Sequence, residues 1–151
     1  MGIYFLQDIQ TTDDGDLVID SFGDLKIANP MRTLTQCVHN VLLTNKGDLR
    51  TEPAFGSNIG TYVGSNNTPM TRTSMERDIL ISFNDQGAVI PEDLNVDVVA
   101  IDIDKVAVMV DVKGSFLYTP TNSTEPLLSD MSMGINLAYI YPFANSQLEE
   151  A

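Results

Sequence analysis

The 151-residue sequence has one cysteine, no tryptophan, and only 8 lysines and arginines against 21 aspartates and glutamates. A single cysteine, Cys37, excludes an intrachain disulfide framework. The net charge of −13 argues against a nucleic-acid binder, because phosphate contacts need a basic face. It argues equally against binding to an anionic membrane surface. The acidic balance instead suits a protein that docks on a basic partner.

Long hydrophobic runs are also missing from the sequence. No run of about 18 apolar residues occurs, so we expect no membrane-spanning helix. The apolar start, Met1–Leu6, lacks a basic segment and a cleavage site, so we expect no signal peptide, cytosolic synthesis and a soluble product. The chain is 43% hydrophobic, which is enough for one core without disulfide or metal support, and its length fits one domain.

Acidic turns around Gly15 and Gly23 raise the question of calcium binding. The calcium loop of an EF-hand has an acid five residues before its glycine. Gln10 and Val18 occupy those positions here. We therefore predict ordinary turn chemistry and no metal site.

Candidate catalytic groups are few. The only histidine, His39, lies two residues from Cys37 in a helical pattern, so the two side chains point in different directions. The sequence contains no G-x-S-x-G elbow, and its glycine-rich loop lacks the G-K-[ST] of a P-loop. Glu52 is the one acid whose apolar neighbours, Pro53 and Phe55, suit a general acid, but no partner carboxylate is singled out. We predict no catalytic residue and no cofactor.

The pattern of apolar residues predicts strands, then two helices, then a strand-rich half. Short apolar runs separated by Asp and Gly turns predict strands in residues 1–28. Asn29-Pro30 and Thr68-Pro69 are typical N-cap and first-turn pairs. Helical spacing follows each pair and ends near Gly47 and Gly87, residues suited to a left-handed cap. Between the helices we expect a loop that is pinned to the core.

The strongest strand signal lies between residues 94 and 118. Valines at the even positions from Val106 to Val112 form one fully apolar face, as in a strand with one side buried. A preceding run rich in Val and Ile and a turn around Asp104 predict a long antiparallel hairpin, 94–103 against 106–118.

The last third of the chain has less pattern. Residues 119–134 form a polar stretch with two prolines, which predicts a long loop, and Ile135–Tyr141 is a final strand-like run. Together the elements predict an α+β fold, with two helices packed on one side of an antiparallel sheet that contains a long β-hairpin. We expect a single domain, 1–151, made of N-terminal strands (1–28), a core (29–118), and an extra loop and final strand (119–151).

Three motifs in order carry a resemblance to a known family. They are Asp16-Leu17 with Gly23-Asp24-Leu25, then Gln36 through Leu43-Thr44 and Gly47-Asp48, then Pro53-Ala54-Phe55-Gly56. They resemble the "D-L … G-D-L", "Q … L-L-T-x-x-G-E/D" and "P-x-F-G" of the baseplate wedge family of contractile phage tails. This lysozyme-like or W-protein family has a relative in the type six secretion baseplate. The resemblance covers most of residues 8–118, and its structural signature is Gly47, Pro53, Phe55 and Gly56.

The resemblance implies a structural role. Members of this family join the baseplate wedge around the central hub, typically in six copies, and start the contractile sheath. The first sheath ring adds strands to a domain similar to the sheath subunit's own interlocking domain. We therefore expect a virion protein of the tail baseplate, assembled in the host cytoplasm, whose partners are the tail sheath protein and other wedge and hub proteins. Strand addition is expected on the hairpin, at Val96, Val98, Val106, Val108, Val110 and Val112.

Two alternatives stay open. A peptidoglycan-degrading tail enzyme requires Glu52 as its acid, whereas another tail hub or completion protein shares the fold class and differs in copy number. The family often has Glu-Pro-Arg after its second helix. Asn84-Asp85-Gln86-Gly87 stands there in this sequence, so the docking role of that motif is not carried over.

Overall fold

A computed structural model gives the fold. It describes the backbone of residues 3–5, 7–87, 89, 91–113, 115–118, 127–129 and 135–142, and the side chains of residues 7–87, 89 and 91–113. The elements in chain order are β1 (Ile3–Phe5), β2 (Asp8–Ile9), β3 (Ile27–Ala28), α1 (Pro30–Leu43), α2 (Pro69–Gln86), β4 (Leu94–Ala100), β5 (Lys105–Val112), β6 (Ser115–Tyr118), β7 (Leu127–Ser129) and β8 (Ile135–Pro142). Short 3-10 turns at Ile59–Tyr62 and Pro91–Asp93 precede α2 and β4.

Helix α1 begins where the sequence predicts and ends earlier. The Asn29 side chain accepts a hydrogen bond of 2.8 Å from the Arg32 N–H, which caps the first turn. The helix ends at Leu43, because Thr44 is extended and its carbonyl accepts the Ser57 N–H at 2.8 Å. The prediction that Gly47 forms the helix cap is therefore wrong, and this glycine lies in the following turn with φ +95°.

Helix α2 has the ends that its sequence predicts. The Thr68 hydroxyl accepts a hydrogen bond of 3.2 Å from the Thr71 N–H, and Pro69 occupies the first turn. Gly87 follows the last helical residue with φ 62°, the left-handed conformation that a glycine adopts without a Cβ clash. Neither of the helices in the described part of the chain is long and apolar enough to cross a membrane.

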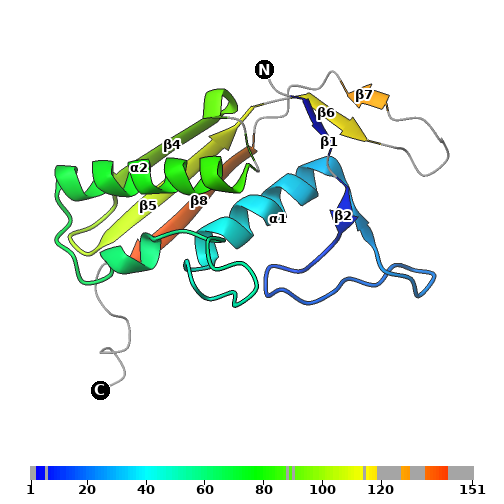
Figure 1. The fold of residues 1–151 in the computed structure, drawn as a ribbon, viewed down its shortest axis with the longest axis horizontal. Helices are drawn as coiled ribbons and strands as arrows, with labels where there is room; N and C mark the ends of the chain where they lie inside the picture. The colour runs from blue at the N-terminus through cyan, green and yellow to red at the C-terminus, as the bar shows by residue number, and fades with distance from the viewer. Residues whose placement is uncertain are drawn as a thin grey trace.

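The main sheet has the strand order β4-β5-β8, with both neighbouring pairs antiparallel. The four even-numbered valines of β5 are completely buried, and α1 and α2 cover that face of the sheet (Figure 1). The chain therefore has an α+β fold with two helices on one side of an antiparallel sheet, as predicted. Among the side chains that the structure describes, the core that joins the layers consists of Leu34, Val38, Val41, Leu42, Ile59, Met75, Ile79, Phe83, Val89, Val96, Val98, Val106, Val108, Val110 and Val112.

The β4–β5 hairpin is shorter than the predicted one. Its paired residues are 94–100 and 106–112, and the turn is closed by the Ile101 N–H, which donates to the Lys105 carbonyl at 3.0 Å. The prediction that the second strand continues to residue 118 is wrong, because β6 lies in another sheet between β1 and β7. The predicted final strand is present as β8. Apart from β7, the predicted loop 119–134 lies outside the described residues.

Candidate functional site

Strand β5 lies in the centre of the main sheet, and its backbone groups are shared between two neighbours. On the β4 side, Lys113 N–H donates to the Asp93 carbonyl at 2.9 Å. The N–H and C=O of successive residues in an antiparallel strand point alternately to opposite sides. The odd-numbered residues of β5 therefore bond to β4, and the even-numbered residues bond to β8.

This geometry places four of the predicted partner-binding valines in the interior of the sheet. Val106, Val108, Val110 and Val112 have buried side chains, and their backbone groups point to the paired residues of β8. While β8 is in place, these residues offer no free backbone group to an added strand. Any strand from a partner has to bind at β4 or β8 instead.

The outer edge of β4 is partly occupied by helix α2. By the same alternation, the backbone groups of Val96 and Val98 point away from β5. The Glu76 side chain reaches from α2 and accepts a hydrogen bond of 2.9 Å from the Val98 N–H. An incoming strand at this edge has to displace that carboxylate.

The outer edge of β8 carries backbone groups that do not bond to β5. Its odd-numbered residues face β5, so the backbone groups of Asn136, Ala138 and Ile140 point away from the sheet. No strand among those that the structure describes pairs with this edge. Sequence reasoning predicted the strand itself, but its place beside β5 depends on a pairing between distant segments.

The residues of the family signature form a structural corner after α1. Gly47 N–H donates to the Pro53 carbonyl at 2.9 Å, and the half-buried Phe55 packs against the core. Gly56, with φ +107°, approaches Thr44 so closely that a Cβ would overlap with its carbonyl oxygen. The signature therefore holds the loop against the end of α1.

Glu52, the acid of the enzyme alternative, lies in an exposed turn of this corner. Its backbone closes the turn, since the Glu52 carbonyl accepts the Phe55 N–H at 3.0 Å. The apolar neighbour Phe55 points into the core instead of enclosing the carboxylate. This setting differs from the apolar pocket that a general acid requires.

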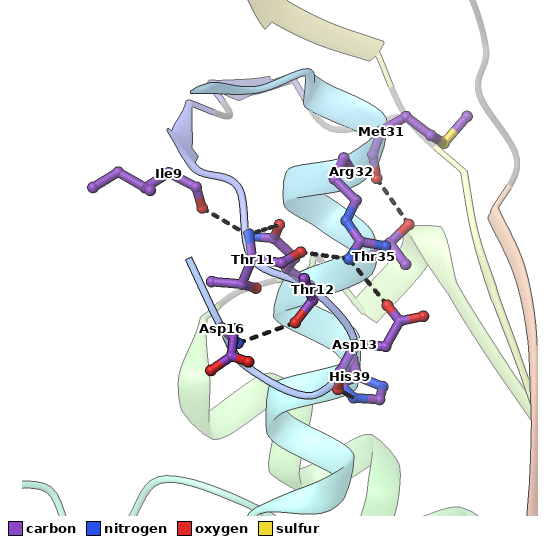
Figure 2. Close-up of polar contacts among 10 residues, drawn as sticks. Ile9, Thr11, Thr12, Asp13, Asp16, Met31, Arg32, Thr35 and His39 are labelled. Carbon is purple, nitrogen blue, oxygen red and sulfur yellow. Dashed lines mark hydrogen bonds and ion pairs between the residues drawn. The ribbon is translucent and has the colours of Figure 1, made fainter. Parts of the chain in front are cut away.

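A polar cluster joins α1 to the N-terminal segment (Figure 2). Arg32 Nη2 donates to the Thr11 carbonyl at 2.6 Å and to Asp13 Oδ1 at 3.0 Å. The Gln36 side chain accepts the Thr11 N–H at 2.9 Å and donates to the Ile9 carbonyl at 3.1 Å. Sequence reasoning missed this cluster, although the spacing of Arg32 and Gln36 places both on one face of α1.

The cysteine and histidine of α1 lie near different residues of this N-terminal segment. Burial raises the pKa of the half-buried Cys37 thiol, and the nearby charge of Asp8 raises it further. The thiol is therefore protonated at neutral pH, which disfavours a role as nucleophile. His39 Nε2 lies 3.3 Å from the Asp13 carbonyl oxygen (Figure 2).

In the acidic turn around Gly23, an aspartate side chain accepts hydrogen bonds from the backbone of the same turn. Asp20 Oδ1 accepts hydrogen bonds from the N–H groups of Phe22 and Asp24, at 2.8 Å and 3.0 Å. This is the turn chemistry that the sequence predicts. Among the side chains that the structure describes, no three of His, Cys, Asp and Glu are grouped so that they could hold a metal ion.

Tyr62 ties the loop before α2 to that helix, and we expect Tyr62→Phe to weaken the protein. The phenol donates a 2.6 Å hydrogen bond to Asp78 Oδ2, so its loss should cost about 1 kcal/mol of unfolding free energy at neutral pH. Burial and the Asp78 carboxylate raise the pKa of Tyr62 to about 12. Because the pKa of Tyr62 is higher in the folded state, the hydrogen bond stabilises the folded protein fully at pH values below the ordinary tyrosine pKa of about 10. This stabilisation is lost as the pH rises from about 10 to about 12.

Urea unfolding at neutral and alkaline pH measures this effect. The difference in unfolding free energy between wild type and Tyr62→Phe should be constant up to about pH 10 and shrink above it. Asp78→Asn, which keeps an acceptor but removes the charge, is the matched control and should retain part of the stability. A difference that is the same at every pH would contradict the role given to the hydrogen bond.

No protein-family model and no curated protein matches the chain. The resemblance to baseplate wedge proteins therefore depends on the order of the motifs between Asp16 and Gly56.

Proposed function

We propose that the chain is a structural baseplate wedge subunit of a contractile tail, and that it initiates sheath assembly by accepting a strand at the edge of its main sheet. The observation that supports this function is the outer edge of β8. Three successive outward-pointing residues, Asn136, Ala138 and Ile140, present backbone donors and acceptors there. An added strand gains main-chain hydrogen bonds from such an edge, and alternate side chains set its register.

The edge of β8 suits an added strand better than the edge of β4. At β4, Glu76 already accepts the hydrogen bond of the Val98 N–H. A partner strand has to replace this charge-assisted bond before it gains its own. We therefore propose that the sheath strand pairs with the outer edge of β8, whose inner edge is already paired with β5 of the hairpin.

The charge of the chain agrees with an assembly role. A net charge of −13 keeps an unassembled subunit soluble and favours neighbours with basic surfaces. We propose six copies in the tail baseplate of the virion, in contact with the sheath protein and with other wedge and hub proteins. No nucleic acid or membrane is among the proposed partners.

The test of this function is proline substitution at the two edges of the sheet in the particle that encodes the chain. Ala138→Pro removes an outward N–H of β8 and no bond to β5. We expect baseplates that contain the variant in six copies but carry no sheath in electron micrographs. Ala100→Pro makes the same change at the outer edge of β4 and should allow normal sheaths.

Normal sheaths on Ala138→Pro particles would overturn strand addition at β8. A loss of sheath with Ala100→Pro alone would place the sheath at β4. A copy number other than six in purified baseplates would favour the hub or completion protein. Thermal unfolding of both purified variants shows whether each one is folded before assembly.

A further inference from the structure

The N-terminal ribbon, residues 8–28, presents an apolar face away from the rest of the molecule. Ile9 pairs with Ile27 across β2 and β3, and an isolated antiparallel bridge joins Ile19 and Leu25. Paired residues, and residues two apart in one strand, lie on the same face of a sheet. The ribbon face therefore consists of Ile9, Leu17, Ile19, Leu25 and Ile27.

All five side chains of the ribbon face are exposed. Their exposed fractions run from 38% for Ile9 to 59% for Leu17, and Phe22 in the turn beside them is 90% exposed. Single exposed apolar residues are ordinary, whereas a contiguous group usually marks an interaction surface. The ribbon projects beyond α1 in Figure 1, so the chain's own core leaves this face open.

The ribbon contacts α1 through the backbone of Ile9 and Thr11 and through β3. Ala28 is only 4% exposed, and the Gln36 side chain bonds to the backbone of Thr11 and Ile9. Arg32 adds a bond to the Thr11 carbonyl. These contacts hold the ribbon against α1, so the apolar face belongs to a segment with a fixed position.

Negative charge surrounds the ribbon face. The ribbon contains six aspartates and a single basic residue, Lys26. Five of these aspartates are exposed, and Asp20 is half-buried. A second copy of the chain would bring two acidic rims together, which like-charge repulsion disfavours. A partner with lysines and arginines around an apolar centre matches both features.

We propose that the ribbon face is the docking surface for a protein whose apolar contact area is bordered by lysines and arginines. The exposed side chains enter the apolar centre of the interface, and the aspartates form its polar rim. Helix α1 lies between the ribbon and β8 (Figure 1), so a partner on the ribbon does not bind at the sheet edge. The proposal is independent of the sheath function and survives the failure of strand addition.

Two synthetic peptides of equal length test the surface, one alternating Leu with Lys and the other Leu with Glu. We expect the folded chain to bind the Leu-Lys peptide, more weakly at high salt, and to ignore the Leu-Glu peptide. Ile19→Thr combined with Leu25→Thr should weaken this binding about tenfold, because apolar side chains at the centre carry most of the affinity.

Ile101→Thr combined with Ile103→Thr is the matched control. Ile101 is 54% exposed and Ile19 is 55% exposed, and neither double variant changes the net charge. Equal weakening by the two double variants, no weakening by either, or no binding of the Leu-Lys peptide overturns the proposal. Sedimentation that shows a dimer dissociated by Ile19→Thr would assign the face to a second copy instead.

Discussion

Val108→Pro is expected to leave no stably folded protein. Val108 is completely buried and pairs with Val98 on one side and Tyr139 on the other. Its N–H points to β8, so proline removes a hydrogen bond of the central strand and places its ring against the neighbouring backbone. The expected loss is about 5 kcal/mol, which equals the whole stability of many small domains.

Far-UV circular dichroism and urea unfolding measure this loss. Ala100→Pro is the control, because Ala100 is exposed at the end of β4 and its N–H points away from β5. It should remain folded and lose about 1 kcal/mol or less. A Val108→Pro protein with wild-type unfolding would show that β5 is not the central strand. If Val108→Pro unfolds the protein as expected, a sheath defect in particles with this variant reflects misfolding and does not test strand addition.

Local sequence patterns were sufficient for much of the fold. Asn29 and Thr68 cap their helices as predicted, because a cap depends only on residues within one turn. The even-numbered valines of β5 form a buried face, because the period of a strand is visible in any short window. These elements combine into the predicted α+β arrangement.

The sequence patterns did not predict the contacts between distant segments. The pairing of β5 with β8 joins residues separated by the whole of 113–134, so no turn signal points to it. The end of α1 depends on Ser57, whose hydroxyl donates to the Leu42 carbonyl at 3.1 Å. A glycine at position 47 suggested a later end, but tertiary contacts decided the boundary.

The candidate docking surface also shows a limit of pattern reasoning. Leu25 and Ile27 alternate with Lys26 as in a half-buried strand, which ordinarily places the apolar side in the core. In the structure this side is exposed. Places where a sound local rule fails are expected at functional sites, which supports the role proposed for the ribbon face.

Gly56→Ala is expected to be the most damaging change in the corner after α1. Gly56 has φ +107°, a conformation that strains residues with a Cβ. The new methyl group would also overlap with the Thr44 carbonyl oxygen, and this group cannot retreat because it accepts the Ser57 N–H at 2.8 Å. Strain and overlap together should cost about 3–5 kcal/mol of unfolding free energy.

Gly47→Ala separates these two contributions. Gly47 has φ +95°, and a Cβ there meets nothing within 4 Å, so only the backbone strain of about 1–2 kcal/mol remains. Urea unfolding of both variants gives the overlap as the difference between them. Because Ser57 holds the last carbonyls of α1, Gly56→Ala should also lower the helical signal before global unfolding, whereas Gly47→Ala should not. Equal losses in the two variants would mean that the close approach to Thr44 does not stabilise the corner.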